Sequence, residues 1–278
     1  MKISALSDIH YPMNRTRLDN AIPEMYDSDV IVVAGDITHN AEHYAHILRK
    51  FGQLPATKIA VLGNHDLYTV NGSSLSKIEF LAKICRENNF HLLDASPLVV
   101  DGVGFVGNIG WYDYEFAQTD IEGDVLVHND HKVHRKRIDE LGEEDFEAKR
   151  FTVNERTYEW NDRNYIKWEF SDKEFLHLQL ERLAKDLETA SKSADKIVYV
   201  SHHVPIWEFV QVKDDPQWCI FNAYQGSPRL GKIASSNPKT RVIICGHSHL
   251  SGYVEVDGVD CYDVSHEFGE LETKEITI

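Results

Sequence analysis

The stretch Val61-Leu62-Gly63-Asn64-His65-Asp66 decides the fold of this chain, because an apolar strand gives way to polar residues at a single glycine. Residues 59–62 are apolar and predict a short buried strand. Gly63 permits a sharp turn where a larger side chain would clash. An amide, an imidazole and a carboxylate follow, at the kind of strand end where α/β proteins place their chemistry. Alone, such a run is more typical of an ordinary turn, so its meaning depends on the rest of the chain.

Further predicted strands end in residues of the same chemical types. The strand ends are Asp8-Ile9-His10 after residues 2–7, Gly35-Asp36 after 30–34, His202-His203 after 196–201, and Gly246-His247-Ser248-His249 after 241–245. Each block has a purely structural explanation, since an aspartate there usually caps a helix and a lone histidine is usually a hydrogen-bonded core or surface residue. Five such ends in one chain are much harder to obtain by chance. We therefore interpret them as one functional site.

The first part of the chain alternates strands with helices, and each strand ends in one of these polar blocks. Helical patterns cover residues 17–25, interrupted by Pro23, then 41–51 and 75–88. This order predicts a layered α/β architecture. Further along, Ser171 and Glu174 form a capping box that begins another helix. The dipeptides Asp101-Gly102 and Asp257-Gly258 predict β-hairpins.

Residues 113–170 interrupt this order and predict an insertion within a single domain that spans residues 1–278. The segment is rich in charged and aromatic residues and has no strong strand pattern. We expect either helices that pack as a lid over an active site or a surface for oligomerisation. His128, His131 and His134 recur at a spacing that fits one helix face, but lysines and arginines lie between them. A solvated face is therefore favoured over a metal site.

A second glycine pattern, Gly102, Gly104 and Gly107, matches a lone dinucleotide-binding motif. No helix is predicted to open after it, since residues 108–111 continue as strand and loop. The dinucleotide interpretation is therefore disfavoured.

Composition restricts the class of partner and the compartment. The 278 residues carry a net charge of −16, which repels long nucleic acids and is compatible with divalent cations and small phosphorylated substrates. No apolar stretch reaches the roughly 18 residues of a membrane helix, and the N-terminus shows no signal peptide. The four cysteines lack paired spacing, which favours buried free thiols in a reducing cytoplasm. Homo-oligomerisation is left open.

The residue types of the five blocks indicate a metal site of oxygen and nitrogen ligands without thiolates. Such a set suits Mn, Fe, Zn, Ni or Co. In Asp-x-His and His-x-His, alternate residues of an extended segment point to the same side and can share one pocket. A carboxylate such as Asp36 can bridge two ions. Two ions about 3.5–4 Å apart can activate a bridging water and stabilise a phosphoryl displacement.

These five blocks resemble the calcineurin-like metallophosphoesterase superfamily over the whole chain apart from residues 113–170. The resemblance implies a four-layer α/β/β/α sandwich of two mixed sheets flanked by helices. It also implies a metal-dependent phosphoesterase with two divalent metal ions at the strand ends. Mn²⁺ is favoured, with Fe, Zn, Ni or Co as alternatives.

The resemblance also implies a role for each matching residue. The first metal would be held by Asp8, His10, Asp36 and His249. The second would be held by Asp36, as the bridge, with Asn64, His202 and His247. His65 would donate a proton to the leaving oxygen or steady the transition state, and Asp66 would orient the His65 ring. His203 receives no role of its own beyond supporting these ligands.

Differences between these blocks and those of particular branches of the superfamily restrict the range of possible activities. The protein Ser/Thr phosphatases have an arginine after Gly-Asp and a glutamate after Asn-His, whereas this chain has Ile37 and Asp66. The acidic charge disfavours the nucleases, and no tyrosine between Thr38 and His43 matches the purple acid phosphatases. The pattern favours a phosphodiesterase acting on a small or nucleotide-type substrate. A phosphomonoesterase is the alternative.

A non-catalytic scaffold of the same fold is less favoured, because every site histidine is present, including His65, which a scaffold does not need. Redox or oxygen chemistry is also disfavoured, because the ligand set does not match a triad of two histidines and one carboxylate. Substrate specificity is expected in residues 113–170 and 207–226. Large aromatic side chains in or next to these segments could stack a nucleobase, although packing is the commoner role; these are Trp111, Tyr112, Trp207 and Trp218.

Overall fold

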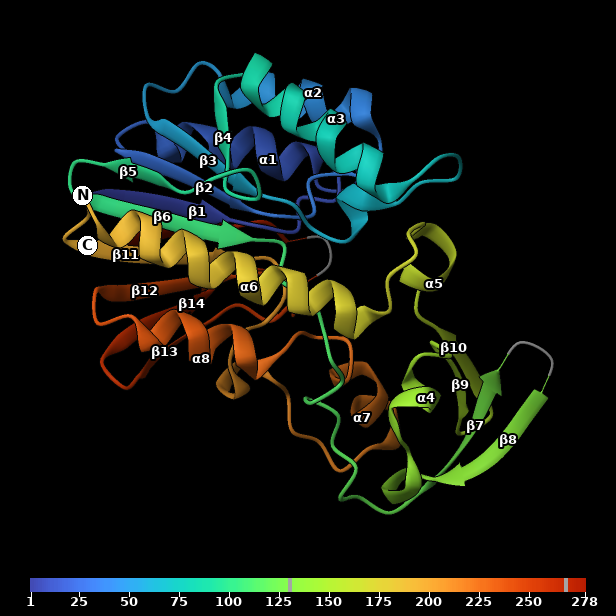
Figure 1. Ribbon diagram of the computed structural model, residues 1–278. Coiled ribbons are helices and arrows are strands. Elements are labelled where there is room, and N and C mark those ends of the chain that lie inside the picture. The colour runs from blue at the N-terminus through green and yellow to red at the C-terminus, as the bar shows by residue number, and fades with distance from the viewer. Residues whose placement is uncertain (130–131, 268–269) are drawn as a thin grey trace.

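The computed structural model describes residues 1–129, 132–267 and 270–278 (Figure 1). One of its two central sheets forms from the N-terminal half of the chain and the last strand. Its strand order is β15 (Lys274–Thr277), β1 (Lys2–Leu6), β2 (Val30–Ala34), β3 (Thr57–Val61) and β4 (Phe90–Leu92). Strands β1 to β4 run parallel, and β15 pairs antiparallel with β1. The sheet is therefore mixed.

The second central sheet forms from the later part of the chain. Its strand order is β13 (Gly252–Val256), β14 (Val259–Asp263), β12 (Thr240–Cys245), β11 (Lys196–Ser201), β6 (Val103–Asn108) and β5 (Leu98–Val100). Strands β14, β12, β11 and β6 are parallel, whereas β13 and β5 pair antiparallel with their neighbours. This sheet is mixed as well.

Helices cover the outer faces of the two sheets (Figure 1). The first sheet is covered by α1 (Arg15–Ala21), α2 (Ala41–Phe51) and α3 (Ser74–Glu87), with the 3-10 helix η1 (Ile22–Met25) after α1. The second sheet is covered by α6 (Asp172–Ser191) and α8 (Pro228–Ser236). The predicted α/β/β/α sandwich of two mixed sheets flanked by helices is thus confirmed.

The apolar runs of the inner strands follow from burial on both faces. In β2, Val30, Val32 and Ala34 belong to a core cluster that takes residues from both sheets. Ile31 and Val33 point the other way, into the cluster beneath the helices. Since successive side chains of a strand alternate between faces, a strand covered on both sides needs apolar residues throughout. Burial of each valine or isoleucine of such a strand stabilises the fold by roughly 1.5–3 kcal/mol.

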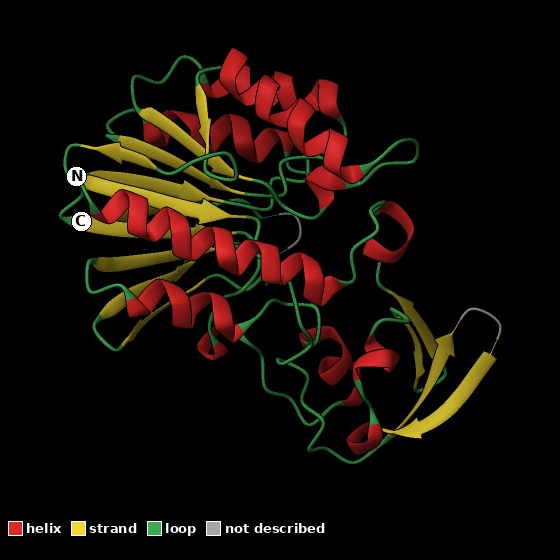
Figure 2. Cartoon of the chain, in the orientation of Figure 1, coloured by secondary structure: helices red, strands yellow, loops and turns green. Residues whose placement is uncertain are grey.

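Residues 113–170 form a small antiparallel sheet, which differs from the helices expected there (Figure 2). Its strand order is β10 (Arg156–Glu159), β9 (Arg150–Val153), β7 (Asp124–Asn129) and β8 (Lys132–Arg137). Val125 and Val127 of β7 are buried in a strict alternation, whereas β8 is a mostly exposed edge strand of charged residues. The charges of β8 hide the strand pattern in the sequence.

The two described histidines of this segment, His128 and His134, therefore lie on strands and not on a helix face. His128 is in β7, where its Nε2 atom lies 2.7 Å from the Thr152 hydroxyl, and His134 is in β8. His131 falls outside the described residues.

Short helical segments complete the chain. They are η2 (His65–Leu67), η3 (Ile138–Glu140), α4 (Glu143–Phe146), α5 (Asp162–Tyr165), η4 (Trp207–Phe209) and α7 (Pro216–Asn222). The capping box of α6 is confirmed, because Ser171 and Glu174 exchange side-chain and backbone hydrogen bonds. Both predicted Asp-Gly hairpin turns are present, and the φ angles of Asp257 and Gly258 are +51° and +79°. Within the described residues, no helix has both the length and the apolar character needed to cross a bilayer.

Candidate metal centre

The loops that follow β1, β2, β3, β11 and β12 meet at one edge of the sandwich. They bring the side chains predicted to bind metals into contact from positions far apart in the sequence. Two groups have ligand atoms that all lie within 4.8 Å of one another: Asp8 with His10 and His249, and Asp36 with His202 and His247. A third group of the same kind joins His10, Asp36 and His65. The predicted residues therefore lie in one cluster.

Asp8 shows that the first group fits a metal ion. Its Oδ1 atom is buried, and it lies 3.6 Å from Nε2 of His10 and 3.6 Å from Nε2 of His249. These distances are too long for hydrogen bonds. They are close to the roughly 3.0–3.5 Å that separates two ligand atoms when each is about 2.1 Å from a shared ion. The group is therefore spaced as ligands of a common cation.

Asp36 lies between the two groups. Its Oδ2 atom is 3.7 Å from Nε2 of His10, and its Oδ1 atom is 3.4 Å from Nε2 of His202. Oδ1 also accepts a hydrogen bond of 2.9 Å from the backbone amide of His65. Since each carboxylate oxygen faces a different group, Asp36 has the placement that a bridging ligand requires.

Asn64 joins the second group. Its Oδ1 atom and Nδ1 of His247 each lie 3.2 Å from Nε2 of His202. On its far side, the His202 ring donates from Nδ1 to the carbonyl oxygen of Ala34 at 2.8 Å, and the His247 ring donates from Nε2 to that of Tyr224 at 3.2 Å. A carbonyl oxygen only accepts, so these bonds leave the opposite ring nitrogens with lone pairs directed at the centre.

His249 follows the same rule. Its Nδ1 atom donates to the carbonyl oxygen of His266 at 3.0 Å, and its Nε2 atom faces Asp8. His203 is buried next to the centre without entering it. Its Nδ1 atom donates a hydrogen bond of 3.0 Å to the carbonyl oxygen of Ile109, and its ring centroid lies 4.5 Å from that of His247.

The backbone of these loops is unusual. Five of the predicted ligands have φ between +43° and +71°, a region that non-glycine residues rarely adopt: Asp8, His10, Asp36, His247 and His249. Each such residue costs about 1–3 kcal/mol, and the cost is tolerated where the surrounding structure holds the conformation. Most of the proposed ligands thus adopt the left-handed conformation, which also occurs at turns elsewhere in the described chain.

Two glycines are required by close approach. A Cβ atom at Gly63 would overlap the carboxylate and backbone nitrogen of Asp36. A Cβ atom at Gly246 would overlap the Ser7 hydroxyl and lie 2.8 Å from a carboxylate oxygen of Asp8. The loops can pack against the two carboxylates only because these positions have no side chain.

The charges of the cluster are strongly coupled. Burial alone would raise the pKa of Asp8, but the imidazoles of His10 and His249 outweigh it and hold that pKa well below its ordinary value. Burial lowers the pKa of His202, yet the Asp36 carboxylate more than offsets this and raises it to about 10. An anionic pocket that attracts protons to imidazole also attracts a dication, which binds the same nitrogen in place of the proton.

His247 shows the opposite shift. Burial, together with the neighbouring His202, lowers its pKa to about 3. The ring is therefore neutral at ordinary pH, which is the state that binds a metal.

His65 and Asp66 turn to different sides of the loop. The His65 ring stacks on Tyr68 at 4.4 Å and faces the cluster, with its Nε2 atom 3.9 Å from Oδ2 of Asp36. Asp66 is buried, and its two oxygens each accept a bond of 2.9 Å, from the amides of Thr38 and Gly63. The expectation that Asp66 orients the His65 ring is therefore corrected. Adjacent residues of the 3-10 turn η2 point in different directions, and Asp66 instead joins two backbone loops.

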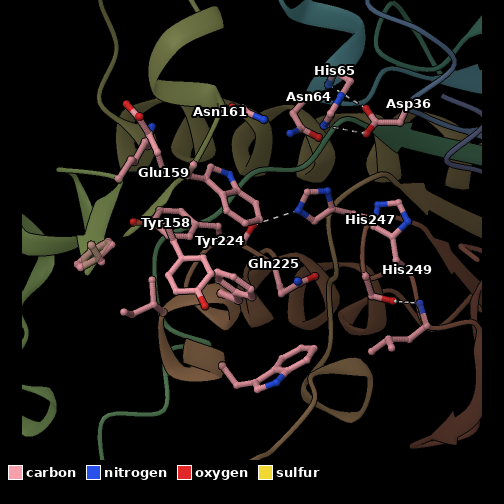
Figure 3. Close-up of a pocket in the computed structure, with 18 of the residues that line it drawn as sticks. Asp36, Asn64, His65, Tyr158, Glu159, Asn161, Tyr224, Gln225, His247 and His249 are labelled. Carbon is pink, nitrogen blue, oxygen red and sulfur yellow. Dashed lines mark hydrogen bonds and ion pairs between the residues drawn. The ribbon is translucent and has the colours of Figure 1, made fainter. Parts of the chain in front are cut away.

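A cavity of about 450 Å³ opens from this cluster toward the small sheet (Figure 3). Its near end has Asp36, Asn64, His65 and His247, and its far end is largely aromatic. The aromatic lining residues are Tyr68, Phe151, Tyr158, Trp160, Trp218, Phe221 and Tyr224. In Figure 3, Tyr158 and Tyr224 lie on the side of the cavity away from Asp36 and His65. The centre thus adjoins an apolar, ring-lined chamber.

The aromatic residues singled out from the sequence divide between core and cavity. Trp218 lines the cavity. Trp111 and Tyr112 are fully buried in the core, and Trp207 is 46% exposed, packing edge-on against Phe116. Packing is therefore the role of Trp111 and Tyr112, in agreement with the commoner expectation.

Sequence reasoning missed a residue next to the centre. Asp162, at the start of α5, accepts a hydrogen bond of 2.9 Å from Nδ2 of Asn64. It stands in a segment rich in acidic residues, and no spacing or motif distinguishes it from them. The Asn-Asp-Arg run after Trp160 resembles an ordinary helix start, so the local sequence indicates a helix and gives no sign of a role at the centre.

Pairs of divalent ions form the catalytic centre of many hydrolases, and the carboxylates and imidazoles gathered at these strand ends are suited to hold such ions. The family model described as calcineurin-like phosphoesterase matches residues 1–251. This chain belongs to that family and is a metal-dependent phosphoesterase. The family uses a dinuclear metal centre, and the carboxylate, imidazole and amide atoms gathered here fit that requirement.

Solved structures of low sequence identity share the fold. Phosphopantetheinyl hydrolase from Mycobacterium tuberculosis is 17% identical with a TM-score of 0.71, over 96% of this chain and 90% of that chain. A dimetal phosphatase from Danio rerio is 11% identical with a TM-score of 0.56, over 97% of this chain and 88% of that chain. Comparison with curated proteins finds no match.

Proposed function

We propose that this chain is a dinuclear-metal phosphodiesterase that cleaves a small phosphodiester with a flat or apolar ester group, a nucleotide-type substrate included. The observation that carries the proposal is the continuity between the cluster of ligands and the aromatic cavity of about 450 Å³. A pocket of this size encloses a small organic molecule. A phosphoryl group at the cluster would place one of its ester groups among the rings.

The proposed ligand sets follow the two groups of side chains. One ion would be held by Asp8, His10, Asp36 and His249. The other would be held by Asp36, Asn64, His202 and His247. When bound, the ions supply Lewis-acid polarisation of the phosphoryl oxygens and an activated water. Mn²⁺ is our choice of metal, with Fe, Zn, Ni or Co as alternatives, since both sets consist of oxygen and nitrogen donors without thiolates.

His65 is the proposed proton donor to the leaving oxygen. Its side chain is 34% exposed and lines the cavity, so a substrate can reach it. The stacked Tyr68 ring and the backbone bond to Asp36 hold it in place. A leaving alkoxide takes up a proton as its bond to phosphorus breaks, and an imidazole at this position can supply it.

The wall of the cavity favours a diester over a monoester. The two proposed ions can balance the charge of either substrate, so the preference depends on the rest of the cavity. Among the described lining residues, Lys149 is the one lysine or arginine, and its ammonium is 2.8 Å from the Asp172 carboxylate. A diester carries one negative charge and a second ester group, which suits an apolar wall.

Two further points belong to this proposal. The chain is proposed to be one domain with residues 113–170 inserted, and the insertion supplies part of the cavity wall through Phe151, Tyr158 and Trp160.

A cytoplasmic location is supported by the four cysteines, all buried as free thiols.

Hydrolysis of bis-p-nitrophenyl phosphate and of p-nitrophenyl phosphate, compared with Mn²⁺ and with a chelator, tests the function. We expect chelator-sensitive turnover with the higher kcat/KM for the diester. A clear preference for the monoester would move the protein to the phosphatases. Absence of turnover with both, in protein shown to hold two ions, would contradict the proposal and support a binding role.

A further inference from the structure

Asp162 is a buried carboxylate that accepts four hydrogen bonds. Its side chain lies at the start of α5, and the residue is 1% exposed. Oδ1 accepts from Nδ2 of Asn64 at 2.9 Å and from the Tyr68 hydroxyl at 2.7 Å. Oδ2 accepts from the Tyr112 hydroxyl at 2.9 Å and from Nε1 of Trp160 at 3.0 Å. All four donors are neutral groups, and both carboxylate oxygens are fully engaged.

The hydrogen bond between Asp162 and Asn64 fixes the orientation of the Asn64 side-chain amide. A carboxylate only accepts, so the group of Asn64 that faces Asp162 must be the NH2 group. The amide is planar, and its oxygen is therefore turned the opposite way, to within 3.2 Å of Nε2 of His202. The orientation follows from chemistry, since a flipped amide would place two acceptor oxygens against each other.

We infer that Asp162 is a positioning residue that holds the carboxamide oxygen of Asn64 toward the metal centre. The inference rests on the proposed assignment of Asn64 as a metal ligand. A hydrogen bond from NH2 to a carboxylate also draws electron density toward the amide oxygen, which makes it a better donor to a cation. Groups that orient metal ligands in this way are typically worth 10–100-fold, roughly, in metal affinity.

The same carboxylate connects the insertion to the centre. Asn64 and Tyr68 follow β3, Tyr112 follows β6, and Trp160 lies in the insertion and lines the cavity. Asp162 therefore fixes a proposed ligand and a ring of the cavity wall at once. Residues 113–170 thus act on the metal centre as well as on the substrate pocket.

Asp162→Asn tests the inference with little change in shape. The new NH2 group faces one of the two pairs of donors, so one pair loses its acceptor, and Asp162→Leu, which offers no acceptor to either pair, is measured beside it so that the contact with Asn64 is lost in at least one variant. The full-length protein, stripped of metal, is titrated with Co²⁺ and followed by visible absorption and calorimetry. We expect one of the two ions to bind about 10–100-fold more weakly and the other to bind as in the wild type. Equal affinity for both ions in the wild type and in both variants would overturn the inference.

Asp172→Asn is the matched control for a general loss of packing. Asp172 is 6% exposed, accepts from Nε1 of Trp111 at 2.8 Å, and pairs with Lys149, but it contacts none of the proposed ligands. We expect it to keep both Co²⁺ affinities even if its thermal stability in chelator falls. A loss of affinity equal to that of Asp162→Asn would assign the effect to packing and overturn the inference.

Asn64→Ala and the double variant Asn64→Ala/Asp162→Asn separate this inference from the ligand assignment. Asn64→Ala is expected to weaken one ion, and the second substitution should then add less than about twofold, because contacts that act through one residue are not additive. Unchanged Co²⁺ binding in Asn64→Ala would remove the ligand assignment itself. A further full loss in the double variant would show that Asp162 acts independently of Asn64.

A measurement on the wild type does not depend on whether the variants fold. The side-chain NH2 of Asn64, followed in ¹⁵N-labelled protein, should be protected from solvent exchange by the bond to Asp162. Exchange at the rate of a solvated carboxamide would overturn the inference.

Discussion

The Nδ1 atom of His202 donates a hydrogen bond of 2.8 Å to the carbonyl oxygen of Ala34. Ala34 ends β2 of the first sheet, whereas His202 follows β11 of the second. A proposed ligand carried by one sheet is therefore oriented by the backbone of the other. The geometry of the centre therefore depends on the packing of the two sheets against each other.

Asp36→Ala is expected to remove both ions, because the two carboxylate oxygens face different groups of ligands. Metal content measured on the purified variant should fall from about two ions per chain to less than one, with loss of diester hydrolysis. His249→Ala should also abolish activity, with loss from the first group. Asp139→Ala, at an exposed ion pair with Arg137, is the control and should change neither quantity. Full activity of a metal-free Asp36→Ala protein would contradict the dinuclear mechanism.

His65→Ala is expected to keep both ions and to lower kcat by roughly 10²–10⁴-fold, the range of general acid–base assistance. The loss should be smallest for substrates whose leaving group is a weak base, since such a group needs no proton. Rates for a p-nitrophenyl and an alkyl ester of the same phosphate check this. A loss of metal would instead make His65 a ligand, as its place in the group with His10 and Asp36 allows.

Trp218→Ala and Phe221→Ala are expected to raise KM for an aryl diester about 2- to 10-fold with little change in kcat, because one ring contact is lost from the cavity wall. Trp207→Ala is the matched control, since Trp207 is 46% exposed and is absent from the described lining of the cavity. Steady-state kinetics of the three variants and the wild type give the KM and kcat values to compare. Equal KM values for Trp218→Ala and the wild type would place the substrate elsewhere.

The native protein is expected to show no rapidly reacting thiol at about pH 8. All four cysteines are buried, and burial raises the pKa of Cys85, Cys219 and Cys261 to about 12. The thiolate is the reactive form and is scarce at such a pKa. Titration with Ellman's reagent should give little colour before denaturant is added and four thiols afterwards. Fast labelling of the folded chain would disprove the burial.

Asp94 is expected to make stability depend on pH. Its oxygens accept from the amides of Leu62 and Ile109 at 2.9 and 2.8 Å, and burial raises its pKa to about 6. The folded carboxyl keeps its proton up to that pH, whereas the unfolded one releases it near pH 3.9, roughly. The folded state binds more protons between these values, so the contribution of Asp94 to the free energy of unfolding falls as pH rises from about 4 to about 6.

Asp94→Asn carries no titrating proton and should lose this slope, which amounts to about 1–3 kcal/mol over the interval. Urea unfolding of wild type and variant at several pH values gives the comparison. Because other carboxylates titrate in both proteins, the difference between the two free energies is the quantity to follow. A difference that stays constant with pH would refute the assignment.

The layered core and the cluster could be predicted from the sequence because their physical causes are local. A strand buried on both faces must be apolar throughout, and β2 shows it as the run from Val30 to Ala34. The proposed ligands at the ends of such strands stand out because carboxylate and imidazole side chains interrupt apolar runs. Parallel strands then carry them to the same edge of the sandwich.

The small sheet and Asp162 could not be predicted, because their causes are distant contacts. Strand β8 carries five basic residues or histidines on a mostly exposed edge, so hydrophobic alternation is missing from half of its hairpin. Asp162 gains its role from donors 50 and 98 residues away in the sequence, Tyr112 and Asn64. The direction of Asp66 depends on the turn geometry of η2, which residue identity alone does not fix.

The proposed ligands are divided between the two sheets, so the chain could be cut into two fragments that each carry part of the metal centre. Asp8, His10, Asp36 and Asn64 precede the connection between β4 and β5, and the remaining proposed ligands follow it. Ala95 and Ser96 in that connection are exposed. A chain divided there would leave an incomplete ligand set on each fragment, so catalysis would report their reassembly, and metal would favour it by binding the joined form more tightly.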